Sequence, residues 1–183
     1  MKRLSIFLLL LFLWLVPGQY LAAQNDEQML PELIASAEAG DADAQINLGT
    51  MYERAQGVPQ DYAEAIRLYR LAAEQGEPIA QYNLAVLYKY GRGLPQSDEE
   101  AVKWNRLAAA QNYLDALFNL AVSFDEGSGV PKDEVEAARL YRLAANQGHA
   151  KAQYNLGINY DNGIAVDQDY EEAAMVPPVG GRR

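Results

Sequence analysis

Hydrophobic residues recur along this chain at helical spacing, and the same pattern returns every 36 residues. Ala44, Leu48 and Tyr52 stand at i, i+4 and i+8, so a helix would carry them on one face. The leucine of each copy is Leu48, Leu84, Leu120 and Leu156. A fixed period of roughly 20 to 50 residues is typical of stacked supersecondary units, none of which buries its apolar face alone.

A turn and then a second helix follow each of these first helices. Glycine, valine or leucine, and proline interrupt the first helix in three copies, as in Gly57-Val58-Pro59. The second helix opens with a side-chain oxygen three residues before a glutamate, which is the pattern of a capping box. The four pairs are Asp61 and Glu64, Ser97 and Glu100, Asp133 and Glu136, and Asp169 and Glu172. We expect these helices to end at Gly76, Asn112 and Gly148, residue types that tolerate a left-handed C-terminal cap.

The pattern therefore predicts an all-α protein built from stacked helix–turn–helix repeats. Three complete units span residues 41–76, 77–112 and 113–148, and a truncated fourth unit spans 149–175. Before them, residues 24–40 are expected to form a capping helix that covers the N-terminal end of the stack. After them, Pro177 and Pro178 cannot continue a helix, so residues 176–183 are expected to form a disordered tail.

The first 23 residues have the layout of a secretory signal peptide. Lys2 and Arg3 precede the apolar stretch 4–16, which is shorter than the roughly 20 residues that a membrane-spanning helix needs. Small residues near Ala23 would allow cleavage before Gln24. An uncleaved membrane anchor is the alternative. We expect a periplasmic or secreted protein that has no membrane span after cleavage.

The composition excludes some partners and one source of stability. The whole chain has a net charge of −10, and without residues 1–23 it has 13 basic and 25 acidic residues, a net charge of −12. Such an acidic surface repels phosphate backbones, so nucleic acid is not expected as a partner. The chain has no cysteine, which excludes a disulfide framework and leaves helix stacking to stabilise the fold.

The repeat resembles a known family. Its motif is A-x-x-x-L-[GA]-x-x-[YF], then the glycine–proline turn, then a helix ending in L-A-A-x-Q-[GN], and the segments 44–52 and 152–160 fit it closely. This is similar to the Sel-one-like repeat (SLR) family, which is related to the tetratricopeptide repeat. The resemblance implies a right-handed α-solenoid that serves as a scaffold or adaptor for other proteins, often exported in bacteria.

The resemblance also points to residues that would face a partner. In the tetratricopeptide geometry, the first helix of each unit lines the concave face. The matching inward positions are Ile46, Tyr82, Phe118 and Tyr154, then Thr50, Val86, Val122 and Ile158, with Asn47, Asn83, Asn119 and Asn155 beside them. Amides can donate to and accept from a peptide backbone, and rings supply contact area, so we expect a protein or peptide ligand. Alternatively, the asparagines tie helix ends to loops and the rings fill gaps between units.

No set of residues in the sequence points to catalysis or to metal binding. His149 is the only histidine, and without a cysteine it cannot complete a zinc site, so we expect it on the surface. No serine opens an S-x-x-K pair, and no glycine-rich phosphate loop occurs. We expect no cofactor and no enzymatic activity. The alternative is a hydrolase acting on cell-wall or β-lactam substrates, because some cysteine-rich relatives of this repeat have been linked to β-lactam binding. The identity of the partner and the oligomeric state stay open.

Overall fold

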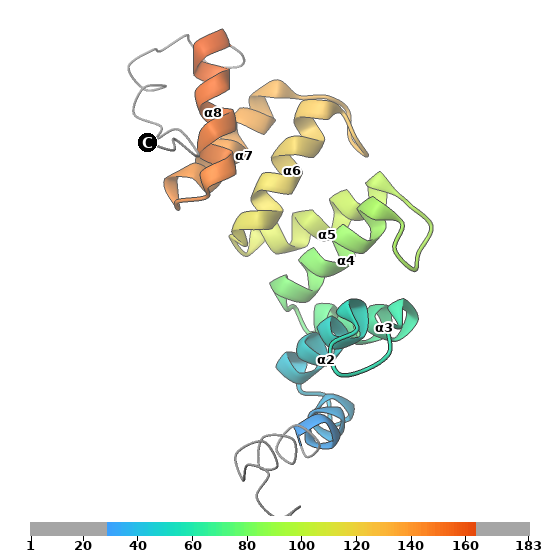
Figure 1. The fold of residues 1–183 in the computed structure, drawn as a ribbon. Helices are drawn as coiled ribbons and strands as arrows, with labels where there is room; N and C mark the ends of the chain where they lie inside the picture. The colour runs from blue at the N-terminus through green and yellow to red at the C-terminus, as the bar shows by residue number, and fades with distance from the viewer. Residues whose placement is uncertain (1–28, 164–183) are drawn as a thin grey trace, which may run out of the picture.

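The computed structural model describes residues 29–163, and this part of the chain is a row of short helices (Figure 1). Residues 29–38 are helical. Seven helices of 13 residues follow: α2 (Ala42–Arg54), α3 (Tyr62–Glu74), α4 (Pro78–Tyr90), α5 (Asp98–Ala110), α6 (Leu114–Glu126), α7 (Glu134–Asn146) and α8 (Ala150–Asn162). No strand occurs between residues 29 and 163. The predicted all-α solenoid with a 36-residue period is confirmed.

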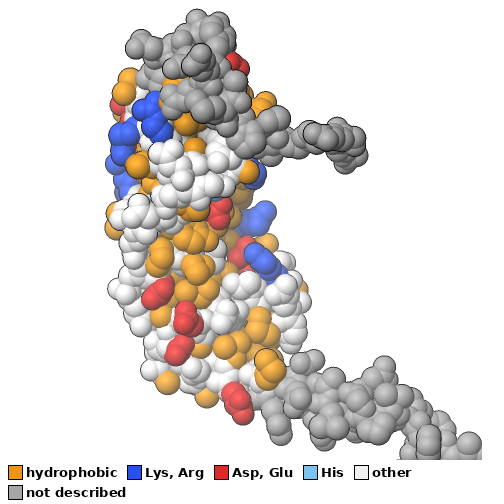
Figure 2. Space-filling view, turned by 90° about the vertical axis from the view of Figure 1, so that its left-hand side faces the viewer, with side chains coloured by type: hydrophobic (Ala, Val, Ile, Leu, Met, Phe, Trp, Pro, Cys, Tyr) orange, Lys and Arg blue, Asp and Glu red, His pale blue; other side chains and the backbone are white. Residues whose placement is uncertain are grey.

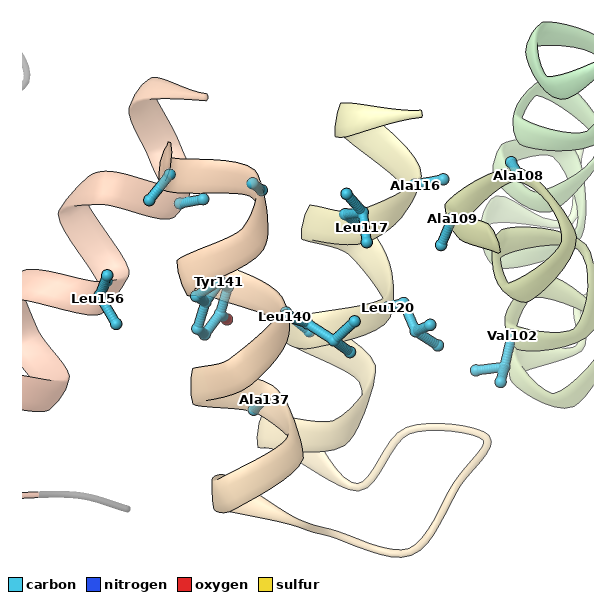
Figure 3. Close-up of a cluster of buried hydrophobic side chains, with 14 of the residues drawn as sticks. Val102, Ala108, Ala109, Ala116, Leu117, Leu120, Ala137, Leu140, Tyr141 and Leu156 are labelled. Atoms are coloured by element: carbon cyan, nitrogen blue, oxygen red, sulfur yellow. The ribbon is translucent and has the colours of Figure 1, made fainter. Parts of the chain in front are cut away.

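The units stack in sequence order, and three buried hydrophobic clusters lie along the stack, each shared between successive units. The even-numbered helices are the first helices of the repeats, the odd-numbered helices are the second, and each helix packs mainly on its neighbours in the chain. In Figure 3, Leu120 of α6 lies between Leu140 of α7 and Val102 of α5, and all three are buried. Because apolar residues of one unit are covered by the next, no unit has a closed core of its own.

The segment 29–38 covers the N-terminal end of this core. Leu30, Leu33 and Ile34 pack against a buried cluster that includes Leu48 of α2 and Leu68 of α3. The described part of the predicted capping helix therefore contacts the first repeat from outside the stack. The predicted signal peptide, the second helix of the fourth repeat and the C-terminal tail lie outside the described residues.

The predicted N-terminal caps of α3, α5 and α7 are confirmed, but the capping box is only half formed. The fourth pair, Asp169 and Glu172, lies outside the described residues. The Asp61 carboxylate accepts a hydrogen bond from the backbone N–H of Glu64 at 3.0 Å, and Ser97 and Asp133 do the same in their repeats. The Glu64 side chain does not return a bond to Asp61, because the Asp61 N–H donates instead to the Tyr52 carbonyl at 3.0 Å. The Glu64 carboxylate pairs with Arg67, and Glu100 and Glu136 likewise pair with a basic residue.

The turns of the second and third repeats lie against the repeat before them. Gly76, Asn112 and Gly148 have positive φ, as predicted for the helix ends. Within the third turn, Ser128 Oγ donates to Asp98 Oδ2 at 2.8 Å and accepts from Lys89 Nζ at 2.9 Å. Both partners belong to the second repeat, so this polar cluster joins two units.

Candidate protein-binding face

The four asparagines at the predicted inward positions have different environments. Asn47 of α2 is exposed, whereas Asn83, Asn119 and Asn155 of the next three first helices are partly buried. Asn119 lies near the Tyr82 hydroxyl and Asn155 near the Tyr141 hydroxyl, and each amide opposes the rise in the pKa of that phenol. These two amides therefore adjoin neighbouring helices and leave only part of their surface to a ligand. Their contact with a partner stays a prediction.

The aromatic column takes part in packing between units. The rings of Tyr82 and Tyr113 are 5.2 Å apart, and the Phe118 ring stacks on His149 at 4.8 Å. Tyr113 and His149 each stand just before the first helix of the following repeat, so both rings bridge a junction. Tyr154, the last ring of the column, is 54 % exposed. Tyr82 and Phe118 thus fill gaps between units, as one alternative held, and they remain partly exposed.

The aliphatic residues at the predicted inward positions also differ in their exposure. Val86 and Val122 are partly exposed, and Ile158 is exposed. Ile46 is 7 % exposed and packs with Ala65, Ile66 and Tyr69, so the expectation that it faces inward to a ligand is wrong. Ile46 lies in the core because α3 covers it from one side.

His149 is a structural residue at a repeat junction, and the expectation of a surface side chain is wrong. Only 12 % of its side chain is exposed. Its Nδ1 accepts a hydrogen bond from the Ala152 N–H at 3.1 Å and caps α8. Its Nε2 lies 3.1 Å from an Asp115 carboxylate oxygen of the previous first helix. A capping role could be suspected from its position, because Asp41 fills the same place before α2.

Burial keeps the tyrosines of this region as neutral phenols. Burial raises the pKa of Tyr141 to about 12, against the opposing effect of the Asn155 amide. It raises the pKa of Tyr69 as well, and the Tyr69 hydroxyl donates to a Glu53 carboxylate oxygen at 2.9 Å. The pKa of Tyr82 rises for the same reason, with smaller contributions from Asp115 and Tyr113. Tyr69 and Tyr141 are fully buried, so of these three phenols only Tyr82 has surface left for a ligand.

A hollow at the N-terminal end of the stack adds to the predicted face. It has a volume of about 980 Å³, and Asn47 and Met51 of α2 line it together with Gln56, Gly57 and residues 29–33. The repeat pattern could not show this feature, because the segment 29–38 stands where a preceding full repeat would otherwise be.

The described residues show neither a metal site nor a membrane-spanning helix. Between residues 29 and 163, no group of three or more His, Cys, Asp or Glu side chains is placed to hold a metal ion. In the same part of the chain, no helix has the length and apolar character that crossing a bilayer needs. Figure 2 shows one side of the stack, on which hydrophobic side chains lie among carboxylates in the lower half and Lys and Arg side chains in the upper half.

Comparison with known families decides the identity of the repeat. A Sel1 repeat profile matches residues 42–77, 78–113, 114–149 and 150–175. The chain belongs to the Sel1 repeat family. Proteins of this family are generally scaffolds that mediate protein–protein interactions.

Solved Sel1 repeat structures share the fold. A protective antigen present in uropathogenic Escherichia coli strains is 38 % identical with a TM-score of 0.79, and the match covers 81 % of this chain and 32 % of the antigen. A Sel1 repeat protein from Oxalobacter formigenes is 34 % identical with a TM-score of 0.78, over 86 % of this chain and 65 % of that protein. This chain therefore spans about a third of the length of the antigen and just under two thirds of the length of the Oxalobacter formigenes protein.

A more distant structure shows the same fold at low identity. Helicobacter pylori cysteine rich protein B is 16 % identical with a TM-score of 0.56, over 70 % of this chain and 92 % of that protein. At this identity the likeness concerns the fold alone. Among curated proteins, none matches this chain.

Proposed function

We propose that this Sel1 repeat protein is an exported, non-catalytic scaffold that binds a protein or peptide along the concave side of its first helices. Membership of a family of interaction scaffolds supports the general role. The observation that carries the specific proposal is the row of partly exposed polar and apolar side chains on α2, α4, α6 and α8. It runs from the hollow beside Asn47, through Val86 and Val122, to exposed Tyr154.

This row has the chemistry that an extended peptide needs. Exposed and half-buried amides can bond to a peptide backbone, and the valines and rings supply apolar contacts between them. The rings of Tyr82 and Phe118 are already held by Tyr113 and His149, so little side-chain freedom is lost when a ligand binds. No observation among the described residues favours the hydrolase alternative.

Site-specific photo-crosslinking tests the binding face. A photoreactive phenylalanine analogue at Tyr154 of α8 should form an adduct with a partner in cells, because this side chain is exposed without being part of the core. The same analogue at Lys132 is the control, since this side chain is 57 % exposed and lies in the turn between α6 and α7, away from the first helices. Adducts of equal yield and size at both positions would refute a concave binding face.

Export has a separate test. N-terminal sequencing of the protein purified from the cell envelope or the medium should begin at Gln24 or close to it. A protein that keeps Met1 and its apolar stretch would show that residues 1–23 act as an anchor or have another role. This result would leave the binding-face proposal intact, because the two tests concern different parts of the chain.

A further inference from the structure

The second helices repeat a pair of exposed side chains on the side away from the core. The pair is an arginine followed by a leucine, and its members are Arg70-Leu71 on α3, Arg106-Leu107 on α5 and Arg142-Leu143 on α7. The three leucines are 37 %, 51 % and 38 % exposed. We call these six residues the outer ladder.

The helical pattern explains why these residues face outward. In α3, the buried positions include Leu68, Tyr69 and Ala72, which pack toward the first helices. Residues 70 and 71 lie between these positions in sequence but on the other side of the helix. The same positions face outward in α5 and α7, because the repeats are copies with a 36-residue period.

Each arginine of the outer ladder rests on an aromatic residue of the next first helix. Arg70 donates to the Tyr88 hydroxyl at 3.1 Å, and Arg106 lies over the Phe124 ring at 5.2 Å. Arg142 lies over the Tyr160 ring at 5.6 Å and donates to its hydroxyl at 2.6 Å. These contacts hold the guanidinium groups in place without neutralising their charge.

The arginines of the outer ladder differ from the basic residues beside them in their ion pairing. Arg67, Lys103 and Arg139 stand one turn earlier, and each forms a salt bridge with a glutamate of its own helix. None of the three ladder arginines forms a salt bridge with another residue between 29 and 163. A chain with a net charge of −10 thus presents a row of positive groups beside exposed leucines.

We propose that the outer ladder binds an acidic, leucine-bearing segment of a protein partner. A guanidinium group can take a carboxylate through two parallel hydrogen bonds, and an exposed leucine favours an apolar contact beside it. The three arginines stand 36 residues apart on successive second helices, so a partner that contacts all of them must span three repeats.

Fluorescence anisotropy with a defined probe tests this proposal on the purified protein. The probe is a labelled 20-residue peptide that repeats Leu-Glu-Glu-Glu, and two comparison peptides replace its leucines by serine or its glutamates by glutamine. We expect saturable binding of the first peptide and at least tenfold weaker binding of both others. The variant Arg70→Gln/Arg106→Gln/Arg142→Gln should lose at least tenfold in affinity, whereas the matching Arg→Lys variant, which keeps the charge but not the bidentate fork, should lose affinity by a smaller factor.

Two control variants show whether probe binding depends on this surface. Arg54→Gln/Lys132→Gln/Lys151→Gln removes three positive charges outside the outer ladder and should leave probe binding within about threefold of the parent. Tyr154→Ala should also leave it unchanged, so a failure of the concave face and a failure of the outer ladder can be told apart. Absence of saturable binding below about 1 mM, or equal losses in the two glutamine triples, would overturn the proposal, as would tighter binding to anionic phosphatidylglycerol vesicles than to the peptide.

Discussion

Replacing Gly129 by alanine should destabilise the contact between the second and third repeats. Gly129 has φ +74°, a conformation that costs an alanine about 1–2 kcal/mol. A Cβ at this residue would also lie 2.4 Å from the carbonyl carbon and oxygen of Asp98 and 2.8 Å from the N of Glu99. These atoms are backbone and cannot rotate away, so overpacking adds about 1–3 kcal/mol. We expect a total loss of about 2–5 kcal/mol in the free energy of unfolding.

Gly148→Ala is the matched control for this prediction. Gly148 has φ +90°, but a Cβ there would meet no atom within 4 Å, so only the conformational cost of about 1–2 kcal/mol applies. Urea unfolding followed by circular dichroism gives both free energies. Hydrogen exchange should place the added loosening of Gly129→Ala at the start of α5, where Asp98 also bonds Ser128 and Lys89. Equal losses in the two variants would show that the turn does not couple the repeats.

Three further predictions concern buried polar groups. Because burial raises the pKa of Tyr69 and that of Tyr141, the latter to about 12 from an ordinary 10, unfolding free energy should hold up to pH 10 and fall from there to about pH 12. Urea unfolding at several pH values should show a smaller fall in the free energy of unfolding for the variant Tyr69→Phe/Tyr141→Phe. Asn105 is 4 % exposed, and its Oδ1 has no hydrogen-bond partner among residues 29–163. Asn105→Leu should therefore add about 1 kcal/mol to the free energy of unfolding, and a decrease in this free energy would contradict the prediction. Because His149 Nδ1 accepts from Ala152, its neutral ring should carry the proton on Nε2, and nitrogen NMR showing the Nδ1–H form would exclude the cap.

The period and the caps made the fold predictable from sequence. A helix must bury one stripe and expose the other, so Leu48 and its copies mark the core without knowledge of the neighbours. Asp61, Ser97 and Asp133 act within their own first turn, and such local hydrogen bonds can be read from spacing alone. The positive φ of Asn112 at a helix end is equally local.

The features that sequence could not settle depend on contacts between helices. The capping box is incomplete because the Tyr52 carbonyl, on another helix, already bonds the Asp61 N–H. The candidate site was ambiguous for a similar reason. Tyr82 and Phe118 have the spacing of an exposed column, and only the stack shows that Tyr113 and His149 cover one side of each ring. A period fixes which positions are equivalent, but it does not fix which neighbour each position meets.

Repetition also changes what an exposed residue can do. A single exposed leucine such as Leu107 is ordinary on a protein surface and indicates nothing. In a solenoid, the equivalent positions form a row, so a partner that contacts one member is already placed near the others. Weak contacts of this kind gain most when several act together, because the later ones form within a single complex. We therefore reason that both proposed surfaces depend on rows, and that changing one residue in either row will weaken binding far less than changing the whole row.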